Sequence, residues 1–385
     1  MNMKWAVAIL FFGALLAHAA PENTSFLQTS QQAETAREAN QLPQAIELYQ
    51  KALQLRPTWY EGWWWLGSVY YDLDLYAEAR AAFQHVLADD KKQGAAYAFM
   101  GLCEYEMRDY DDARTHLSKW RAAGEPGGES VANVANFRWA ELLTQDGRFL
   151  ESLSLLDKMA LELGPNPSIE EAMGLAWMQM KYVPETYPPQ KREMVWLAGS
   201  AASWMSVNKH LEYSLAYLDR LTSRYGDQPN VHLLRGFVDE AVKDTDGAID
   251  EDAKELKISP NSIVPMIQFA LLCADAGKLL DEADTAARKA LTLEPDSMRS
   301  HFAMGRVLEA EQKWAQSAVE LEKAEQISPG VSKVHYQLSR VYLKLGRKED
   351  AQRESAAFQS LEKAQPIPGV AGSDSPSQKT EGPSQ

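Results

Sequence analysis

Apolar residues recur along most of the chain three or four positions apart, which is the stripe of an amphipathic helix. Two such stripes, separated by a short polar break, form a unit that repeats at a step of about 34 residues. The step joins Ala45, Ala79 and Ala113. It also joins two further sets of positions, which are Tyr49, Phe83 and Leu117, and Ala52, Val86 and Trp120. The pattern therefore predicts a series of helical hairpins, one for each unit.

Small residues and prolines punctuate each unit. Gly67 and Ala79 would let the two helices of a hairpin approach closely. Proline cannot continue a helix, so it ends the second helix of several units, at Pro57, Pro260, Pro295 and Pro329. One hairpin cannot bury its apolar face alone, whereas stacked hairpins bury a continuous core. We therefore expect no single globular core.

These units resemble the tetratricopeptide repeat, whose pattern is W-x2-L-G-x2-Y, then A-x3-F, then Ala and Pro. The second unit matches it at Trp63, Leu66, Gly67, Tyr70, Ala79 and Phe83, whereas Val86 and Lys91 depart from the usual Ala and Pro. The resemblance implies an all-α fold, a right-handed α-solenoid of stacked helix-turn-helix repeats. Repeats are expected at about 26–59, 60–93, 94–127, 133–166, 195–228, 229–263, 264–297, 298–331 and 332–365.

The middle of the array is irregular. Residues 182–190 (YVPETYPPQ) contain three prolines and cannot be helical through their length. Two alternatives are open: residues 168–208 form one hairpin with a long connection, or a second helix is missing. The expected domains are a signal peptide (1–19), a loosely ordered N-terminal segment (20–32), an N-terminal sub-array (26–181), a Pro-rich connection (182–192), a C-terminal sub-array (193–365) and a disordered tail (366–385).

The first residues carry the three parts of a secretory signal peptide. Lys4 supplies a positive start, Trp5 to Leu16 is an apolar run, and Ala17-His18-Ala19 matches the small-x-small cleavage pattern. The run is too short to span a bilayer comfortably, which needs ~20 apolar residues, and no comparable run follows. We expect cleavage after Ala19, no transmembrane segment in the mature chain, and an exported protein that is periplasmic or secreted.

The chain is acidic and poor in cysteine. Its 385 residues include 39 Lys plus Arg against 54 Asp plus Glu, for a formal net charge of −15. Binding to nucleic acid needs clustered basic side chains that neutralise phosphates, so nucleic acid is not expected as a partner. Cys103 and Cys273 occupy equivalent positions in units far apart, too distant for a disulfide. The composition therefore favours neither a nucleic-acid binder nor a disulfide-built scaffold.

The sequence contains no nucleophile elbow, P-loop, dinucleotide-binding motif or zinc-protease motif. His232, His301 and His335 share the position where the repeat pattern has Trp, a side chain that packs between the two helices of a hairpin. Equivalent positions in stacked units lie about 10 Å apart, too far to share a metal with ligands at ~2 Å. We therefore expect packing roles for these histidines, no metal site, no cofactor and no enzymatic activity.

In the tetratricopeptide family, the first helix of each unit lines the concave face. The family's ligand-facing positions give two linings here. The N-terminal lining is acidic and aromatic, with candidate partner-binding residues Trp64, Tyr71, Asp72, Tyr105, Glu106 and Phe137. The C-terminal lining is basic and aromatic, with Arg299, Phe302, Arg306, Lys333, Tyr336, Arg340 and Lys344. An ordinary hydrated helix face would carry similar residues, and this alternative stays open. Trp64 is the tryptophan expected to face a ligand.

The resemblance implies an exported, non-enzymatic interaction scaffold or assembly adaptor that binds an extended peptide or a partner protein in its concave groove. Aromatic rings would anchor the ligand, and charges would orient it. The N-terminal groove would accept a basic or aromatic-rich segment, and the C-terminal groove an acidic segment or a C-terminal carboxylate. The alternative is an accessory carbohydrate-binding or polymer-export module, in which an oligosaccharide stacks on the same rings.

Overall fold

The computed structural model describes residues 21–88, 93–184, 186–207 and 210–364. Within these ranges the secondary structure consists of nineteen α-helices and one short 3-10 helix, without a strand, which confirms the all-α class. None of these helices is long and apolar enough to cross a membrane. The expected signal peptide (1–19) and tail (366–385) lie outside the described residues.

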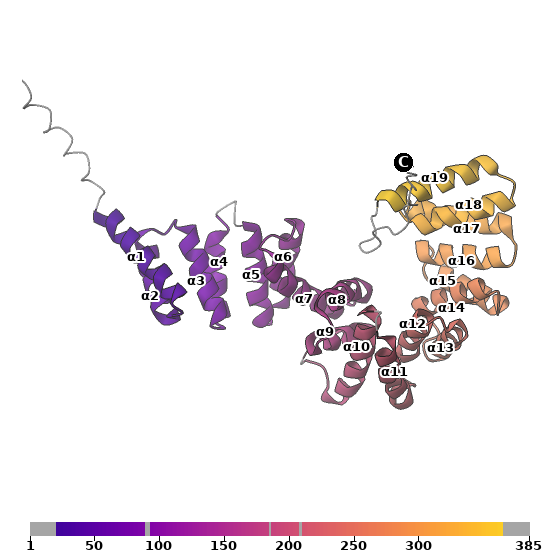
Figure 1. Cartoon of the computed structure of the whole chain (residues 1–385), viewed down its shortest axis with the longest axis horizontal. Helices are drawn as coiled ribbons and strands as arrows, with labels where there is room; N and C mark the ends of the chain where they lie inside the picture. Colours follow the sequence, from indigo (N-terminus) through magenta and orange to yellow (C-terminus); the bar gives the residue numbers. More distant parts are fainter. Residues whose placement is uncertain (1–20, 89–92, 185, 208–209, 365–385) are drawn as a thin grey trace, which may run out of the picture. The chain divides into compact units, whose positions relative to one another are not determined.

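The chain divides into two compact units, Met1–Val207 and Asn208–Gln385, which we call unit 1 and unit 2. In unit 1 successive helices pair as hairpins (Figure 1). The pairs are α1 (Pro21–Glu38) with α2 (Leu42–Leu55), α3 (Tyr60–Asp72) with α4 (Tyr76–Val86), α5 (Gln93–Glu106) with α6 (Tyr110–Ala122), α7 (Glu129–Asp146) with α8 (Phe149–Leu163), and α9 (Pro167–Trp177) with α10 (Arg192–Val207), which follows the 3-10 helix η1 (Pro189–Lys191).

Unit 2 begins with a single helix, α11 (Leu211–Tyr225), which packs against the next hairpin. Four hairpins follow and stack on one another. The pairs are α12 (Val231–Ala241) with α13 (Thr245–Ile258), α14 (Ile263–Ala276) with α15 (Leu280–Leu293), α16 (Met298–Ala310) with α17 (Trp314–Ile327), and α18 (Ser332–Lys344) with α19 (Lys348–Ala364). The fold is thus an α-solenoid of helix-turn-helix repeats, as the spacing predicts.

The α9–α10 hairpin decides between the two alternatives for the middle of the array. Its helices approach so closely that neither Gly174 nor Gly199 has room for a Cβ atom against the facing backbone. Of the two alternatives, the pairing of α9 with α10 supports one hairpin with a long, proline-containing connection. The expected repeat at 195–228 is wrong, because α10 already serves as the second helix of this hairpin. For the same reason the units divide after Val207, and not at the connection 182–192.

The segment expected to be loosely ordered, 20–32, differs as well, because α1 begins at Pro21. Phe26 is buried, and its ring lies edge-on to Trp59, with the ring centroids 5.2 Å apart. The guanidinium carbon of Arg56 lies 3.7 Å from the centroid of the Phe26 ring. One aromatic side chain in an otherwise polar segment thus docks α1 on its neighbours, since an aromatic ring buries a large apolar area.

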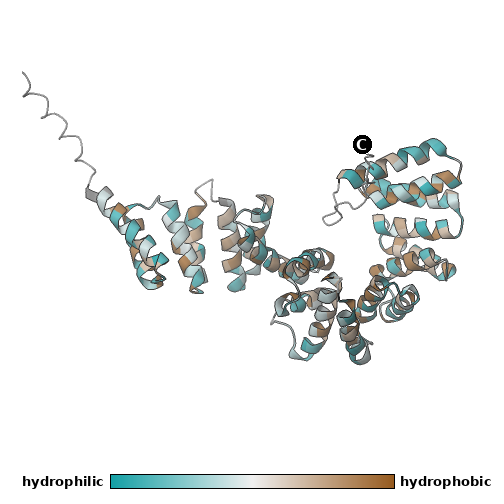
Figure 2. Ribbon diagram, viewed as in Figure 1, coloured by the Kyte–Doolittle hydropathy of each residue, from teal (hydrophilic) through white to brown (hydrophobic). Residues whose placement is uncertain are grey.

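The core follows the repeat. Ala45, Ala79 and Ala113 are fully buried, and so are the larger side chains one turn further along each second helix. The larger side chains are Tyr49, Phe83 and Leu117. Figure 2 shows hydrophobic and hydrophilic residues sharing most helices, as expected where each helix has one buried stripe. Burying one such side chain stabilises the fold by roughly 1.5–3 kcal/mol.

Candidate functional site

A groove of about 600 Å³ lies in unit 2, and most of the predicted C-terminal site residues line it. Five helices contribute, namely α12, α14, α16, α18 and α19. The lining residues are Phe237, Glu240, Ile267, Gln268, Leu271, Leu272, Asp275, Arg299, Phe302, Arg306, Ser332, Lys333, Tyr336, Gln337, Phe358 and Glu362. The first helices of successive hairpins present equivalent positions side by side, so the groove has rows of similar side chains.

Two cations near the N-terminal ends of α16 and α18 form the first row. Arg299 and Lys333 are exposed, and neither forms an ion pair within the described part of the chain. Their charges are therefore available to a ligand. The sequence predicts basic residues on α16 and α18, and the groove adds three carboxylates from other helices, Glu240 of α12, Asp275 of α14 and Glu362 of α19. The groove carries both signs of charge.

Aromatic side chains form the second row. Phe302 and Tyr336 lie at equivalent positions of α16 and α18. The last helix adds Phe358, whose ring centroid lies 5.5 Å from that of Tyr336. Tyr336 keeps 43% of its surface exposed. A large apolar side chain of this kind, with a polar rim, is the usual anchor for a bound segment.

Ion pairs occupy the third row. Arg306 binds Asp275 and Glu309 through its two terminal nitrogens and is largely buried. Arg340 reaches the same Glu309, with Nη2 3.2 Å from Oε1. Because carboxylates already neutralise both arginines, they contribute less to attracting an acidic ligand than the sequence suggests. Neither Arg340 nor Lys344 is among the lining residues. The Nζ atom of Lys344 lies 5.8 Å from the ring centroid of Trp314 on α17.

In unit 1 three of the predicted N-terminal site residues, Tyr105, Glu106 and Phe137, contact Arg138 of α7, which sequence reasoning missed. Arg138 donates to Glu106, at 2.8 Å, and to the buried Glu141, at 3.0 Å. Its guanidinium carbon lies 4.5 Å from the ring centroid of Tyr105 and 5.6 Å from that of Phe137. Burial raises the pKa of Glu141 even though Arg138 opposes the shift. The expected acidic lining is therefore partly neutralised.

Trp64 and Tyr71 lie in an aromatic cluster next to this arginine. Trp64 is half-buried and packs edge-on against Phe83 and Phe99, with centroid distances of 5.5 and 5.3 Å. Tyr71 contacts Phe99 at 5.7 Å, and burial, followed by the charge of Glu106, raises its pKa to about 12. Asp72 is exposed. The rings hold neighbouring hairpins together, and only part of the Trp64 surface is open to a ligand.

The sequence contains a signal for Arg138, and the predicted site residue Arg306 shares it. Arg138 and Arg306 each begin an R-x-x-E sequence on a first helix, and each finds a second carboxylate one unit earlier, at Glu106 and Asp275. Side chains three positions apart share a helix face, and equivalent positions of stacked units are neighbours. Searching for both spacings together would have found the two networks.

The three histidines pack between the helices of their hairpins, as the sequence predicts. Each places Nδ1 against a glutamate nineteen positions later, at Glu251, Glu320 and Glu354, with distances of 2.5, 2.7 and 2.8 Å. Each histidine is thus satisfied within its own hairpin rather than shared along the stack. Glu325, His335 and Glu354 do place three donor atoms within 4.8 Å of one another.

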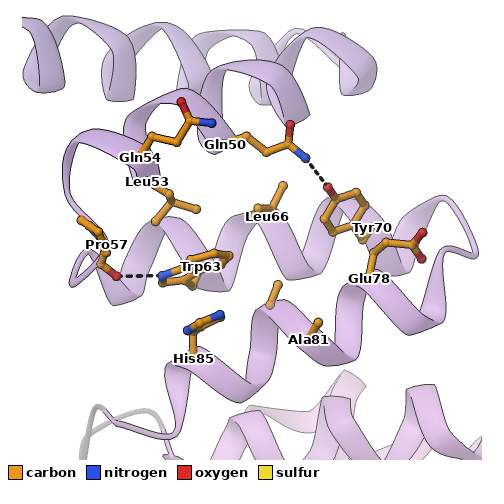
Figure 3. Close-up of a pocket in the computed structure, with 11 residues that line it drawn as sticks. Gln50, Leu53, Gln54, Pro57, Trp63, Leu66, Tyr70, Glu78, Ala81 and His85 are labelled. Atoms are coloured by element: carbon orange, nitrogen blue, oxygen red, sulfur yellow. Dashed lines mark hydrogen bonds between the residues drawn. The ribbon is translucent and has the colours of Figure 1, made fainter.

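A second hollow, of about 690 Å³, lies in unit 1 between α2, α3 and α4 (Figure 3). Trp63 forms one wall; its ring stacks on His85 at 4.0 Å, and its Nε1 donates to the carbonyl of Pro57 at 2.9 Å. Gln50 donates to the hydroxyl of Tyr70 at 2.8 Å. Sequence reasoning missed this hollow. Its signal is a pair of small residues, Ala81 and Ala82, where the flanking units carry Glu47 and Leu48, or Thr115 and His116.

Comparison with known protein families identifies one of the repeats. Residues 35–74 match the family described as TPR repeat, so the chain contains a tetratricopeptide repeat at the α1–α3 segment. No curated protein matches the chain. Among solved structures, MamA from Desulfovibrio magneticus RS-1 is 16% identical over 43% of this chain and 97% of its own, with a TM-score of 0.37. The APC/C hetero-tetramer Cut9–Hcn1 is 14% identical over 90% of this chain and 66% of that chain, with a TM-score of 0.39. Likenesses this distant carry no inference about partners.

Proposed function

We propose that this chain is a non-enzymatic interaction scaffold that holds an extended segment of a partner protein in the groove of unit 2. The observation that carries the proposal is a pair of cations, Arg299 and Lys333, that form no ion pair with any described residue. They lie beside the aromatic row of Phe302, Tyr336 and Phe358. An apolar side chain of the partner would cover the rings, and a nearby carboxylate would pair with the cations. The expected ligand is an acidic segment, or a C-terminal carboxylate, that contains an aromatic residue.

The aromatic and arginine cluster of unit 1 would act as a second contact. Glu106 and Asp72 favour a basic or aromatic-rich segment there, as the sequence predicts. Because Arg138 neutralises part of that lining, this contact is expected to be the weaker one.

A pair of fluorescent ten-residue peptides tests the groove of unit 2. One peptide carries acidic residues around a phenylalanine, and the other has lysines in place of the acids. We expect the full chain to bind the acidic peptide more tightly, by fluorescence anisotropy at low salt. Reversing both cations, Arg299→Glu with Lys333→Glu, should weaken that binding at least tenfold, because like charges then face each other.

Lys344→Glu is the matched control, because Lys344 lies on the same helix as Lys333 but outside the lining. It should leave the affinity within about twofold of the unaltered chain, since an exposed charge outside the contact contributes little. Equal binding of both peptides, or equal loss in the control and the double variant, would contradict the proposal.

The export of the chain is part of the same proposal and rests on the signal-like residues 1–19 alone. Sequencing the N-terminus of the protein isolated from its native cells tests it. A mature chain that begins at Ala20 supports export, and a chain that keeps Lys4 contradicts it.

The hollow in unit 1 supports a second candidate, carbohydrate binding. Trp63 and His85 supply ring surface, whereas Gln50, Gln54 and Glu78 supply hydrogen-bonding groups around it. Sugar rings pack an apolar face on aromatic rings and bond through their hydroxyls, so these chemistries match. Titration calorimetry with maltoheptaose and chitohexaose tests the idea. Binding that survives His85→Ala with Gln54→Ala would place any sugar elsewhere.

A further inference from the structure

His335 on α18 lies between two hydrogen-bond acceptors. Its Nδ1 is 2.8 Å from Oε2 of Glu354 on α19, and its Nε2 is 2.9 Å from the carbonyl oxygen of Pro329, just before α18. A neutral imidazole donates from only one ring nitrogen. A carboxylate and a carbonyl both accept, so both contacts are satisfied only when the site holds one additional proton.

The charges around His335 favour that proton. On α17, Oε1 of Glu325 lies 3.9 Å from Nδ1, and on α19, Arg353 donates to the other oxygen of Glu354 at 3.0 Å. Burial lowers the pKa of His335, but the carbonyl of Pro329 and the two glutamates outweigh it, so the pKa is raised above its usual range. Two carboxylates and one cation therefore surround the imidazole.

The equivalent positions of other hairpins show that this site is distinct. His301 has the same two acceptors, Glu320 and Pro295. Lys323 donates to Glu320 there, as Arg353 donates to Glu354. The His335 site differs by its second carboxylate, Glu325, and no other histidine among the described residues belongs to such a group of three donor residues. In unit 1 Trp63 takes the place of the histidine: its Nε1 donates to the carbonyl of Pro57, six residues earlier, without any titratable proton. The residue nineteen positions after Trp63 is Ala82, where His335 has Glu354.

We propose that the proton held by His335 stabilises the packing of α18 against α19 and against the turn at Pro329, because it lets both ring nitrogens donate. When the proton leaves, one acceptor faces a ring lone pair and the hairpin loosens. A histidine whose proton is held more tightly in the fold stabilises it at low pH, and this stabilisation is lost as pH rises through the folded-state pKa. Lys333 and Tyr336 of α18 and Phe358 of α19 line one end of the groove. The protonation of His335 therefore also affects how firmly this end of the groove is held in place.

Unit 1 supplies the design of a matched variant. His335→Trp with Glu354→Ala copies the Trp63 and Ala82 pair, so the variant keeps a donor to Pro329 but has no proton to lose. Hydrogen exchange of the α18–α19 amides, corrected for intrinsic rates, is measured from pH 6 to pH 8.5 in the full chain. If the pKa of His335 is one unit higher in the folded chain than in the unfolded chain, raising the pH across this range should lower the protection of these amides against exchange by up to about tenfold. Each further unit of difference lowers it by up to the same factor.

The unaltered chain should lose protection in α18 and α19, whereas the double variant and the α3–α4 hairpin should stay level. Nuclear magnetic resonance of the His335 ring should also place its pKa above 6.5, and Glu325→Gln should lower it. A pKa of 6.5 or below, or an equal loss of protection in the double variant, would overturn the proposal. So would micromolar zinc ions that shift the His335 resonance reversibly with a chelator, since the three donor atoms would then be a metal site.

Discussion

At the scale of single residues, Asp252 of α13 combines complete burial with a side chain that carries no hydrogen bond among the described residues. Burial, reinforced by the charges of Glu240 and Glu255, raises its pKa to about 9. Because an isolated buried carboxylate is costly, Asp252 is protonated at neutral pH.

This carboxyl predicts a pH-dependent stability. The folded chain holds the Asp252 proton more tightly than the unfolded chain, so the free energy of unfolding falls as pH rises from about 4 to about 9. Asp252→Asn removes that dependence. The free energy of unfolding of the variant, relative to that of the unaltered chain, should therefore rise by roughly 1 kcal/mol for each pH unit between 5 and 8. Urea unfolding of both chains at pH 5, 6.5 and 8 measures it. Parallel pH profiles would show that Asp252 does not titrate in this range.

At the scale of elements, the hairpin turns share one backbone feature. A residue with a positive φ recurs between the first and second helix, for example at Asn40, Asp74, Gln312 and Gly346. In the α14–α15 turn this includes Leu279, with a φ of 49°. A large side chain in this region is strained by roughly 1–2 kcal/mol, whereas glycine adopts it freely.

Leu279→Gly should therefore stabilise the chain by about 0.5–1 kcal/mol, because it relieves strain and loses little burial from a half-exposed side chain. The converse is Gly346→Ala, where a Cβ atom would meet nothing within 4 Å. Any loss there is conformational, and we expect about 1 kcal/mol. Thermal unfolding of the two variants measures the gain in stability expected for the first and the loss expected for the second. A destabilised Leu279→Gly chain would mean that its side-chain contacts outweigh the strain.

The helices and their pairing also show which parts of the fold could be predicted from the sequence and which could not. Helices and hairpins followed from the step joining Ala45, Ala79 and Ala113, because each hairpin contacts its neighbours and little else. The pairing of α10 with α9 did not follow, since the 182–190 connection has no counterpart elsewhere. The candidate groove was predicted through Arg299, Phe302 and Lys333. Its last wall was not, because Phe358 comes from a second helix, outside the ligand-facing positions of first helices.

At the scale of the whole molecule, the two units each have their own stack of hairpins and their own buried clusters. Repeat arrays are stabilised by nearest-neighbour contacts, so a local loss need not unfold distant hairpins. Tryptophan is distributed unevenly between the units. Of the tryptophans beyond residue 20, only Trp314 lies in unit 2, and the others lie in unit 1.

This distribution gives two probes for one unfolding experiment, because tryptophan fluorescence reports mainly on unit 1 and circular dichroism reports on both units. Leu338→Ala removes a fully buried side chain of unit 2, and Phe83→Ala removes one of unit 1, each at a cost of about 2–5 kcal/mol. Leu338→Ala should move part of the circular dichroism transition to lower urea and leave the fluorescence transition nearly in place. Phe83→Ala should move the fluorescence transition. If both probes shifted together in both variants, the chain would unfold as one cooperative body, and the two units would not be independent in stability.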